Sequence, residues 1–122
     1  MNGPWMLIGA IYGLLGVAAG AFGAHALRAR LSGDLLAIYR TAVEYQFWHA
    51  LALLAVGLLA RQAAGVWLTA SGVAFTLGVL VFSRSLYILA LSGIRVLGAV
   101  TPLGGLALIA GWACLIVHLA RP

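Results

Sequence analysis

The fold of this chain is decided by residues 41–56, TAVEYQFWHALALLAV. They belong to an apolar segment long enough to cross a bilayer, yet the segment carries Glu44, Gln46 and His49. An ionisable group at membrane depth costs roughly 2.5–3.5 kcal/mol on insertion scales, so it normally faces the protein interior and has a partner there. Other helices must therefore supply an interior around this one.

The composition of the whole chain is that of an integral membrane protein. Of its 122 residues 65% are hydrophobic and 7% are charged, and the mean hydropathy is +1.13. So few charged side chains cannot provide the polar surface of a soluble domain of this size. The length allows one compact bundle, so we expect a single transmembrane domain over residues 1–122.

Four apolar segments follow one another along the chain. Each is near the roughly 20 residues that a spanning helix needs, and the expected helices cover residues 4–27, 34–60, 66–91 and 101–119. Residues suited to the helix ends are Pro4, Ser32, Asp34, Gly93 and the pair Thr101-Pro102. Short loops make sequential helices antiparallel, so the sequence predicts an all-α, integral membrane four-helix bundle.

The charged residues predict an orientation in the membrane. The seven cationic residues are all arginines and give a net charge of +5. They lie between apolar runs and form no basic stretch interleaved with aromatic residues, so the expected partner is the lipid bilayer and not a nucleic acid. The first and third loops hold Arg28, Arg30, Arg40 and Arg95, and the opposite side holds Arg61 and Arg121. The positive-inside rule then places the first and third loops in the cytoplasm and both termini outside.

A stripe of glycines marks the first expected helix. Its members are Gly9, Gly13, Gly16, Gly20 and Gly23. At 100° per residue they fall within an arc of about 80° on one face. Glycine lets another helix backbone come close, so this face is expected to pack tightly against a helix. The sequence leaves open whether that helix belongs to the same chain or to another protomer.

The third expected helix carries a stripe of hydroxyl groups. Thr69, Thr76 and Ser83 recur every seven residues, and Tyr87 follows four residues later on the same face. Hydroxyls in transmembrane helices often bond to carbonyls of their own helix, and this is the favoured interpretation. The alternative is a polar seam that faces the second helix.

Glu44 and Arg84 are candidates for an intramembrane ion pair. Both lie on the order of 10–15 Å from loops at the same membrane side, so antiparallel neighbours could bring them to one level. A guanidinium and a carboxylate would then form a bidentate pair. Two alternatives remain open: Arg84 extends to the lipid headgroups, and Glu44 pairs with Arg40 one helical turn earlier.

Tyr45, Gln46 and His49 complete the candidate polar site. Their spacing of three and four residues places them on one face, about 140° from Glu44. A hydrogen-bonded interior histidine is the favoured interpretation of His49, and a proton or solute site is the alternative. No metal site or cofactor is expected, because the only cysteine, Cys114, lies in an apolar run and no His/Cys cluster has ligand spacing.

The aromatic residues of the four segments divide into two groups. Trp5 and Trp67 begin helices on the outer side and are typical of interfacial anchors. Trp48 and Trp112 lie deeper in their segments and are expected to pack. No nucleophile elbow or phosphate loop is present, so nothing in the sequence favours an enzyme.

Five motifs resemble those of the YgdD-like family of small four-helix membrane proteins, a family of unknown function. In order they are residues 20–27 (GAFGAHAL), 45–51 (YQFWHAL), 82–87 (FSRSLY), 101–105 (TPLGG) and 111–112 (GW). The resemblance covers essentially the whole chain and implies a bacterial inner-membrane protein. It implies no substrate. The third motif departs from the family pattern, because Arg84 stands where that family usually has glycine.

Three functions are compatible with these observations. The first is a non-enzymatic accessory or interaction protein that binds itself or another membrane protein. The second is an oligomeric conduit or carrier for protons or a small solute, lined by the polar groups of the second helix, Glu44, Tyr45, Gln46 and His49. The third, an enzyme acting on a lipid, has only the polar cluster in its favour.

Overall fold

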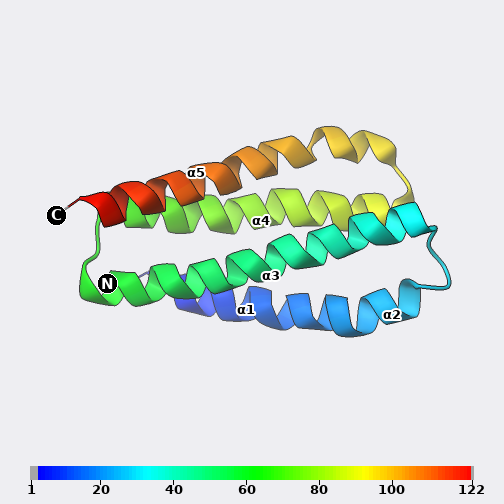
Figure 1. The fold of residues 1–122 in the computed structure, drawn as a ribbon, viewed down its shortest axis with the longest axis horizontal. Coiled ribbons are helices and arrows are strands. Elements are labelled where there is room, and N and C mark those ends of the chain that lie inside the picture. The colour runs from blue at the N-terminus through cyan, green and yellow to red at the C-terminus, as the bar shows by residue number, and fades with distance from the viewer. Residues whose placement is uncertain (1–2, 122) are drawn as a thin grey trace.

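The computed structural model describes residues 3–121, and within them every regular element is a helix (Figure 1). The first rod consists of α1 (Trp5–Ala18), the π-helical segment η1 (Ala19–Gly23) and α2 (Ala24–Leu27). It is followed by α3 (Gly33–Gln62), α4 (Val66–Ser92), the short 3₁₀ helix η2 (Arg95–Ala99) and α5 (Thr101–Ala120). Four rods are long and apolar enough to span a membrane, and the fourth of them includes η2. The ends of the first rod, α3, α4 and α5 lie within two residues of the predicted bounds. The all-α membrane architecture is therefore confirmed.

The helices lie side by side in chain order, each antiparallel to the next (Figure 1). The main interfaces join α1 to α3, α3 to α4, and α4 to α5. In this view α1 and α5 occupy opposite edges, with α3 and α4 between them. The two central helices consequently bury the largest share of their residues, and they carry most of the polar side chains described below.

The helix ends follow the local sequence at two of the predicted places. The Ser32 hydroxyl accepts a hydrogen bond from the Leu35 amide at 3.2 Å and caps α3. Gly93 ends α4 with φ of 75°, a left-handed conformation that glycine adopts without steric cost. At the same end of the molecule Asp34 forms an ion pair with Arg95 at 2.8 Å, which links the first turn of α3 to η2.

Thr101 does not cap α5, contrary to the expectation. Val100 precedes the helix in a helical conformation, and Thr101 is its first residue. The Thr101 hydroxyl lies 2.7 Å from the Ser85 hydroxyl and therefore joins α5 to α4. The interhelical bond takes the hydroxyl that a cap would have used.

The glycine stripe of the first rod faces α3 of the same chain. A Cβ atom added at Gly9 would lie 2.8 Å from the carbonyl oxygen of Ala50, and one added at Gly20 would lie 2.9 Å from Cγ1 of Val43. At Gly23 it would meet the Tyr39 hydroxyl. The two backbones thus approach closely because side chains are missing at these positions.

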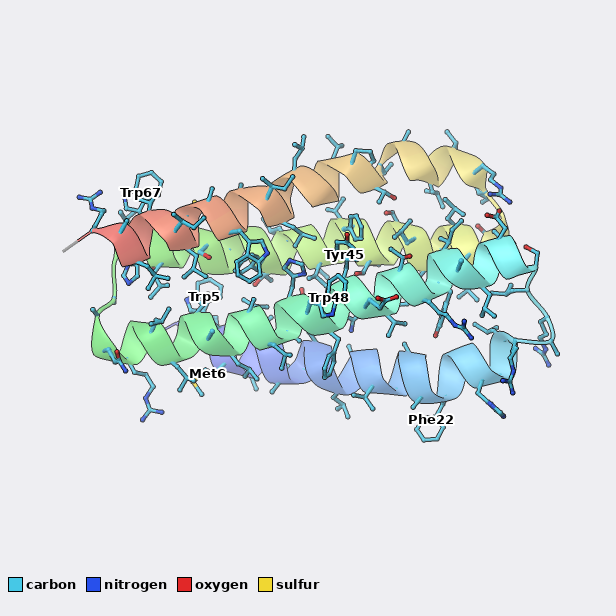
Figure 2. All side chains as sticks on the ribbon, viewed as in Figure 1. Trp5, Met6, Phe22, Tyr45, Trp48 and Trp67 are labelled. Atoms are coloured by element: carbon cyan, nitrogen blue, oxygen red, sulfur yellow. The ribbon has the colours of Figure 1, made fainter. Side chains whose placement is uncertain are left out.

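Trp5 is a core residue and not the interfacial anchor that was expected. Its side chain is 8% exposed and fills the notch at Gly72, where an added Cβ would lie 2.5 Å from its indole ring. A tryptophan at a helix start can face either lipid or protein. Here it faces the protein, because Gly72 on α4 leaves room for its ring. Trp67, by contrast, is 38% exposed and points away from the bundle (Figure 2).

The π-helical segment coincides with a contact from α3. The Tyr39 hydroxyl donates a hydrogen bond to the Ala19 carbonyl at 2.7 Å. A π-helical turn leaves backbone carbonyls free of their usual partners, so an outside donor can occupy one. Tyr39 fixes the level at which the first rod lies along α3.

Candidate functional site

Gln46 joins three helices through its side-chain amide. It lies on α3 and is buried, with 6% of its surface exposed. Its Nε2 donates to the Tyr12 carbonyl of α1 at 2.9 Å, and its Oε1 accepts from the Tyr87 hydroxyl of α4 at 2.8 Å. The Tyr12 hydroxyl in turn donates to the Thr76 carbonyl at 2.9 Å. A buried amide without such partners would be costly, and here both of its ends are occupied.

His49 joins α3 to α5. Its ring is 4% exposed and lies among aromatic side chains. Nδ1 lies 2.7 Å from the Tyr45 carbonyl, and the indole Nε1 of Trp112 donates to Nε2 at 3.0 Å. A carbonyl can only accept and an indole N–H can only donate, so the ring is the neutral tautomer with its proton on Nδ1. Both ring nitrogens are thereby used.

Tyr45 and Trp48 extend this aromatic group along α3 (Figure 2). The Tyr45 ring lies 4.5 Å from the Phe82 ring of α4 and 5.1 Å from the Trp48 ring, measured between centroids. Trp48 is 51% exposed, so it packs on Tyr45 with one side only. Together with residues of α5 they line a groove of about 530 Å³.

Gln46 and His49, predicted to share one face of their helix, bond to different neighbours. Gln46 bonds to α1 and α4, whereas His49 bonds to Trp112 of α5. The two residues are 60° apart on an ideal helix, and this angle is enough to direct them to different neighbours. The candidate site therefore consists of two separate groups.

Glu44 and Arg84 do not form the ion pair considered from the sequence. Within residues 3–121 the one ion pair is Asp34–Arg95, so Glu44 pairs with neither Arg84 nor Arg40. Glu44 lines a cleft beside the first rod, whereas Arg84 lines a groove between α1 and α4. Both side chains are exposed and lie on different sides of the α1–α3 contact.

The heights of these charges explain why no pair is needed. Ser83 donates to the Ala42 carbonyl at 2.8 Å, which brings Arg84 level with this part of α3. Residues 41–60, between Arg40 and Arg61, make about 30 Å of helix, the thickness of a hydrocarbon core. On this length we expect Arg40 and Arg84 to lie at a bilayer boundary and Glu44 to lie one turn inside it. At that height exposed charged side chains reach the headgroups.

In the hydroxyl stripe of α4, some groups bond to their own helix and others bond to α3. Thr76 donates to the Gly72 carbonyl of its own helix at 2.8 Å, as favoured. Ser83 and Tyr87 instead bond to α3, through the Ala42 carbonyl and the Gln46 side chain. Thr69 is exposed. The polar seam exists in the half of α4 that lies nearer the third loop.

Several residues that make hydrogen bonds between the helices were not predicted from the sequence as site residues. They are Tyr12, Tyr39, Ser71 and Ser85. Ser71 donates to the Gly111 carbonyl at 2.8 Å, and with the Ser85–Thr101 contact it joins α4 to α5. A serine or tyrosine inside an apolar segment is the signal that could have found them, since such groups need partners in lipid.

The polar side chains inside the bundle satisfy one another. No buried side-chain nitrogen or oxygen atom in residues 3–121 lacks a hydrogen-bond partner. In the same residues no three His, Cys, Asp or Glu side chains come together as a possible metal site. Cys114 is half-buried on α5, and His118 lines a cleft with Arg121 at the end opposite to Arg28.

Comparison with known proteins gives a consistent family assignment. Residues 19–105 match the family described as "Protein of unknown function (DUF423)". The UPF0382 membrane protein of Staphylococcus haemolyticus is 43% identical over 113 residues, which cover 93% of this chain and 92% of that protein. The UPF0382 inner membrane protein YgdD of Escherichia coli is 41% identical over 122 residues, with 99% and 93% covered. No solved structure matches.

Proposed function

The chain belongs to the DUF423 family of membrane proteins, and on this premise we propose that it is a non-enzymatic accessory protein that binds another membrane protein through its lipid-facing surface. The relatives named above are described as membrane proteins, and YgdD as an inner membrane protein. This supports an inner-membrane location for the present chain.

One observation carries the proposal: the polar side chains inside the bundle are consumed by contacts among the helices. Gln46 uses both ends of its amide on α1 and α4, and His49 uses both ring nitrogens on α3 and α5. A proton relay or a catalytic base needs a nitrogen that can exchange its proton with a substrate. The interior polar groups instead fix the register of the helices and stabilise the bundle. The outer surface is therefore the part of the molecule that we assign to function.

The outer surface is apolar over most of its height. Leu14, Phe22, Leu103 and Ile116 are each more than 60% exposed, and Phe22 projects away from the bundle (Figure 2). Association of transmembrane helices depends on side-chain packing more than on the hydrophobic effect, so such a surface can take either lipid or a partner helix. The two edge helices, α1 and α5, have the largest free faces for this purpose.

The arginines support an orientation with the first and third loops in the cytoplasm and both termini outside. The end of the bundle with these loops holds Arg28, Arg30, Arg40, Arg84 and Arg95. The other end holds Arg61 and Arg121. Alkaline phosphatase, which is active only outside the cytoplasm, should be active when fused after the C-terminus and inactive when inserted after Arg30. The reverse pattern would refute this orientation.

The accessory role is tested by comparing flux with complex formation. Membranes extracted as native nanodiscs should yield the chain in a complex with a different membrane protein, and the purified chain in liposomes should give no proton flux above that of empty liposomes. Substitution of large outward residues, for example Leu14→Ala with Leu103→Ala, should release the partner and leave the fold intact. Proton flux that is lost in His49→Ala would instead establish a conduit.

A further inference from the structure

A cleft of about 400 Å³ opens between the first rod and α3 at the end that carries the first loop. It is lined by Gly20, His25, Arg28, Arg40, Val43 and Glu44. We call it the Arg28–Arg40 cleft. Two guanidinium groups thus come from different elements, Arg28 after α2 and Arg40 on α3, and they line the same cleft.

Within residues 3–121 the guanidinium groups of this cleft have no carboxylate partner. Glu44 lies one helical turn after Arg40, the spacing that favours an ion pair on a helix, yet no pair is formed. The Arg28 guanidinium donates instead to Nδ1 of His25 at 3.3 Å. Both arginines therefore keep most of their hydrogen-bond donors free for an external anion.

The cleft also holds one negative charge, which narrows the choice of ligand. A ligand that is only anionic would meet the repulsion of Glu44. A ligand with a phosphate and a primary ammonium can place the phosphate against the arginines and the ammonium against the carboxylate. Guanidinium groups suit phosphate oxygens, and an ammonium donates three hydrogen bonds, which a carboxylate can accept.

The position of the cleft along α3 indicates that its ligand is a lipid. Arg40 lies about 30 Å along α3 from Arg61, at the boundary where headgroups lie against a membrane protein. Gly20 and Val43 give the cleft an apolar wall next to the charged groups. A phospholipid presents these same two parts, a charged headgroup and an acyl region, at this level of the bilayer.

We propose that the Arg28–Arg40 cleft binds the headgroup of phosphatidylethanolamine, with its phosphodiester on Arg28 and Arg40 and its ammonium on Glu44. The site is independent of the accessory role. Phosphatidylcholine carries the same charges but no N–H donor, and phosphatidylglycerol carries a phosphate but no cation. These two lipids are therefore matched controls for the two halves of the recognition.

Native mass spectrometry of the full chain in detergent micelles, titrated with dioleoyl lipids, tests the proposal. Phosphatidylethanolamine should bind about tenfold more tightly than phosphatidylcholine or phosphatidylglycerol, because the ammonium–carboxylate contact is charge-assisted. Arg28→Gln and Arg40→Gln should each weaken binding of phosphatidylethanolamine about tenfold. Arg61→Gln, at the opposite end, should leave it unchanged. Circular dichroism checks that all variants keep their helices.

Glu44→Gln separates this site from general attraction to lipid. It should remove the preference for phosphatidylethanolamine over phosphatidylcholine and leave phosphatidylcholine binding at its wild-type level. The proposal is overturned if Glu44→Gln keeps the preference, if phosphatidylglycerol binds as tightly as phosphatidylethanolamine, or if the two arginine variants bind like wild type. Soluble phosphoethanolamine that displaces the lipid at equal concentration would show that the ligand is a soluble headgroup and would overturn the lipid assignment.

Discussion

The indole Nε1 of Trp112 on α5 donates a hydrogen bond to Nε2 of His49 on α3 at 3.0 Å. The two residues are 63 positions apart in the chain. The contact fixes the tautomer of the histidine, since Nδ1 must then donate to the Tyr45 carbonyl. It also ties α5 directly to α3, although the main neighbour of α5 is α4.

Removal of His49 should destabilise the bundle. His49→Ala leaves the Trp112 indole N–H unpaired and opens a cavity beside the aromatic neighbours of the histidine. The free energy of unfolding in detergent should therefore fall by about 2–3 kcal/mol. Trp112→Phe keeps a ring but loses the donor and should cost about 1 kcal/mol. The double variant should show a coupling energy of roughly 0.6–1.7 kcal/mol. A coupling energy of zero would mean that the hydrogen bond contributes nothing.

Gln46 should be a stability residue whose effect depends on Tyr87. Gln46→Leu leaves the Tyr87 hydroxyl without its acceptor, and a loss of about 1–2 kcal/mol in unfolding free energy is expected. In a Tyr87→Phe background the same substitution should cost less, because no hydroxyl remains unsatisfied. Gln62→Leu, at the exposed end of α3, is the control and should be close to neutral. Equal losses in both backgrounds would contradict the bond to Tyr87.

Two glycines of the first rod should respond differently to alanine. At Gly9 the new methyl group would lie 2.8 Å from the Ala50 carbonyl oxygen, so α1 and α3 must separate, at a cost of about 1–3 kcal/mol. At Gly13 the nearest side-chain atom, Ala50 Cβ, is 4.0 Å away, and alanine should be neutral or stabilising. Thermal denaturation in detergent measures both variants. Similar melting temperatures for the two would argue against the close approach at Gly9.

Gly23 and Tyr39 should be coupled through the space that they share. A Cβ atom at position 23 would meet the Tyr39 hydroxyl, so Gly23→Ala should also break the bond from Tyr39 to the Ala19 carbonyl. We expect a loss of about 1–3 kcal/mol from this overpacking. Tyr39→Phe removes the hydroxyl and should relieve most of the cost. Additive losses in the double variant, measured by unfolding in detergent, would disprove the coupling.

Glu44 and Arg84 should act independently. Both are exposed, and they form no ion pair. Glu44→Gln and Arg84→Gln should each change the unfolding free energy by less than about 0.5 kcal/mol, and the double variant should equal their sum. A coupling energy above about 1 kcal/mol would restore the ion pair that the sequence first suggested.

The positions of the four spanning helices could be predicted because the signals for them are local. Hydropathy gives a segment its length, and Ser32 and Gly93 set helix ends through contacts with residues only a few positions away. Part of the glycine stripe could be predicted for the same reason, since the angle between Gly9 and Gly16, both in α1, depends only on the helical repeat. A segment carries this information whatever its neighbours are.

The sequence by itself thus determined an all-α membrane bundle, the bounds of its helices and which face of the first rod packs closely. Only the tertiary structure decided that Gln46 meets α1 and α4, that His49 meets α5, and that Trp5 fills the notch at Gly72. The reason is geometric. A sequence fixes the direction of each side chain around the axis of its own helix, but the direction in which a neighbouring helix lies is set by the packing of all the helices together.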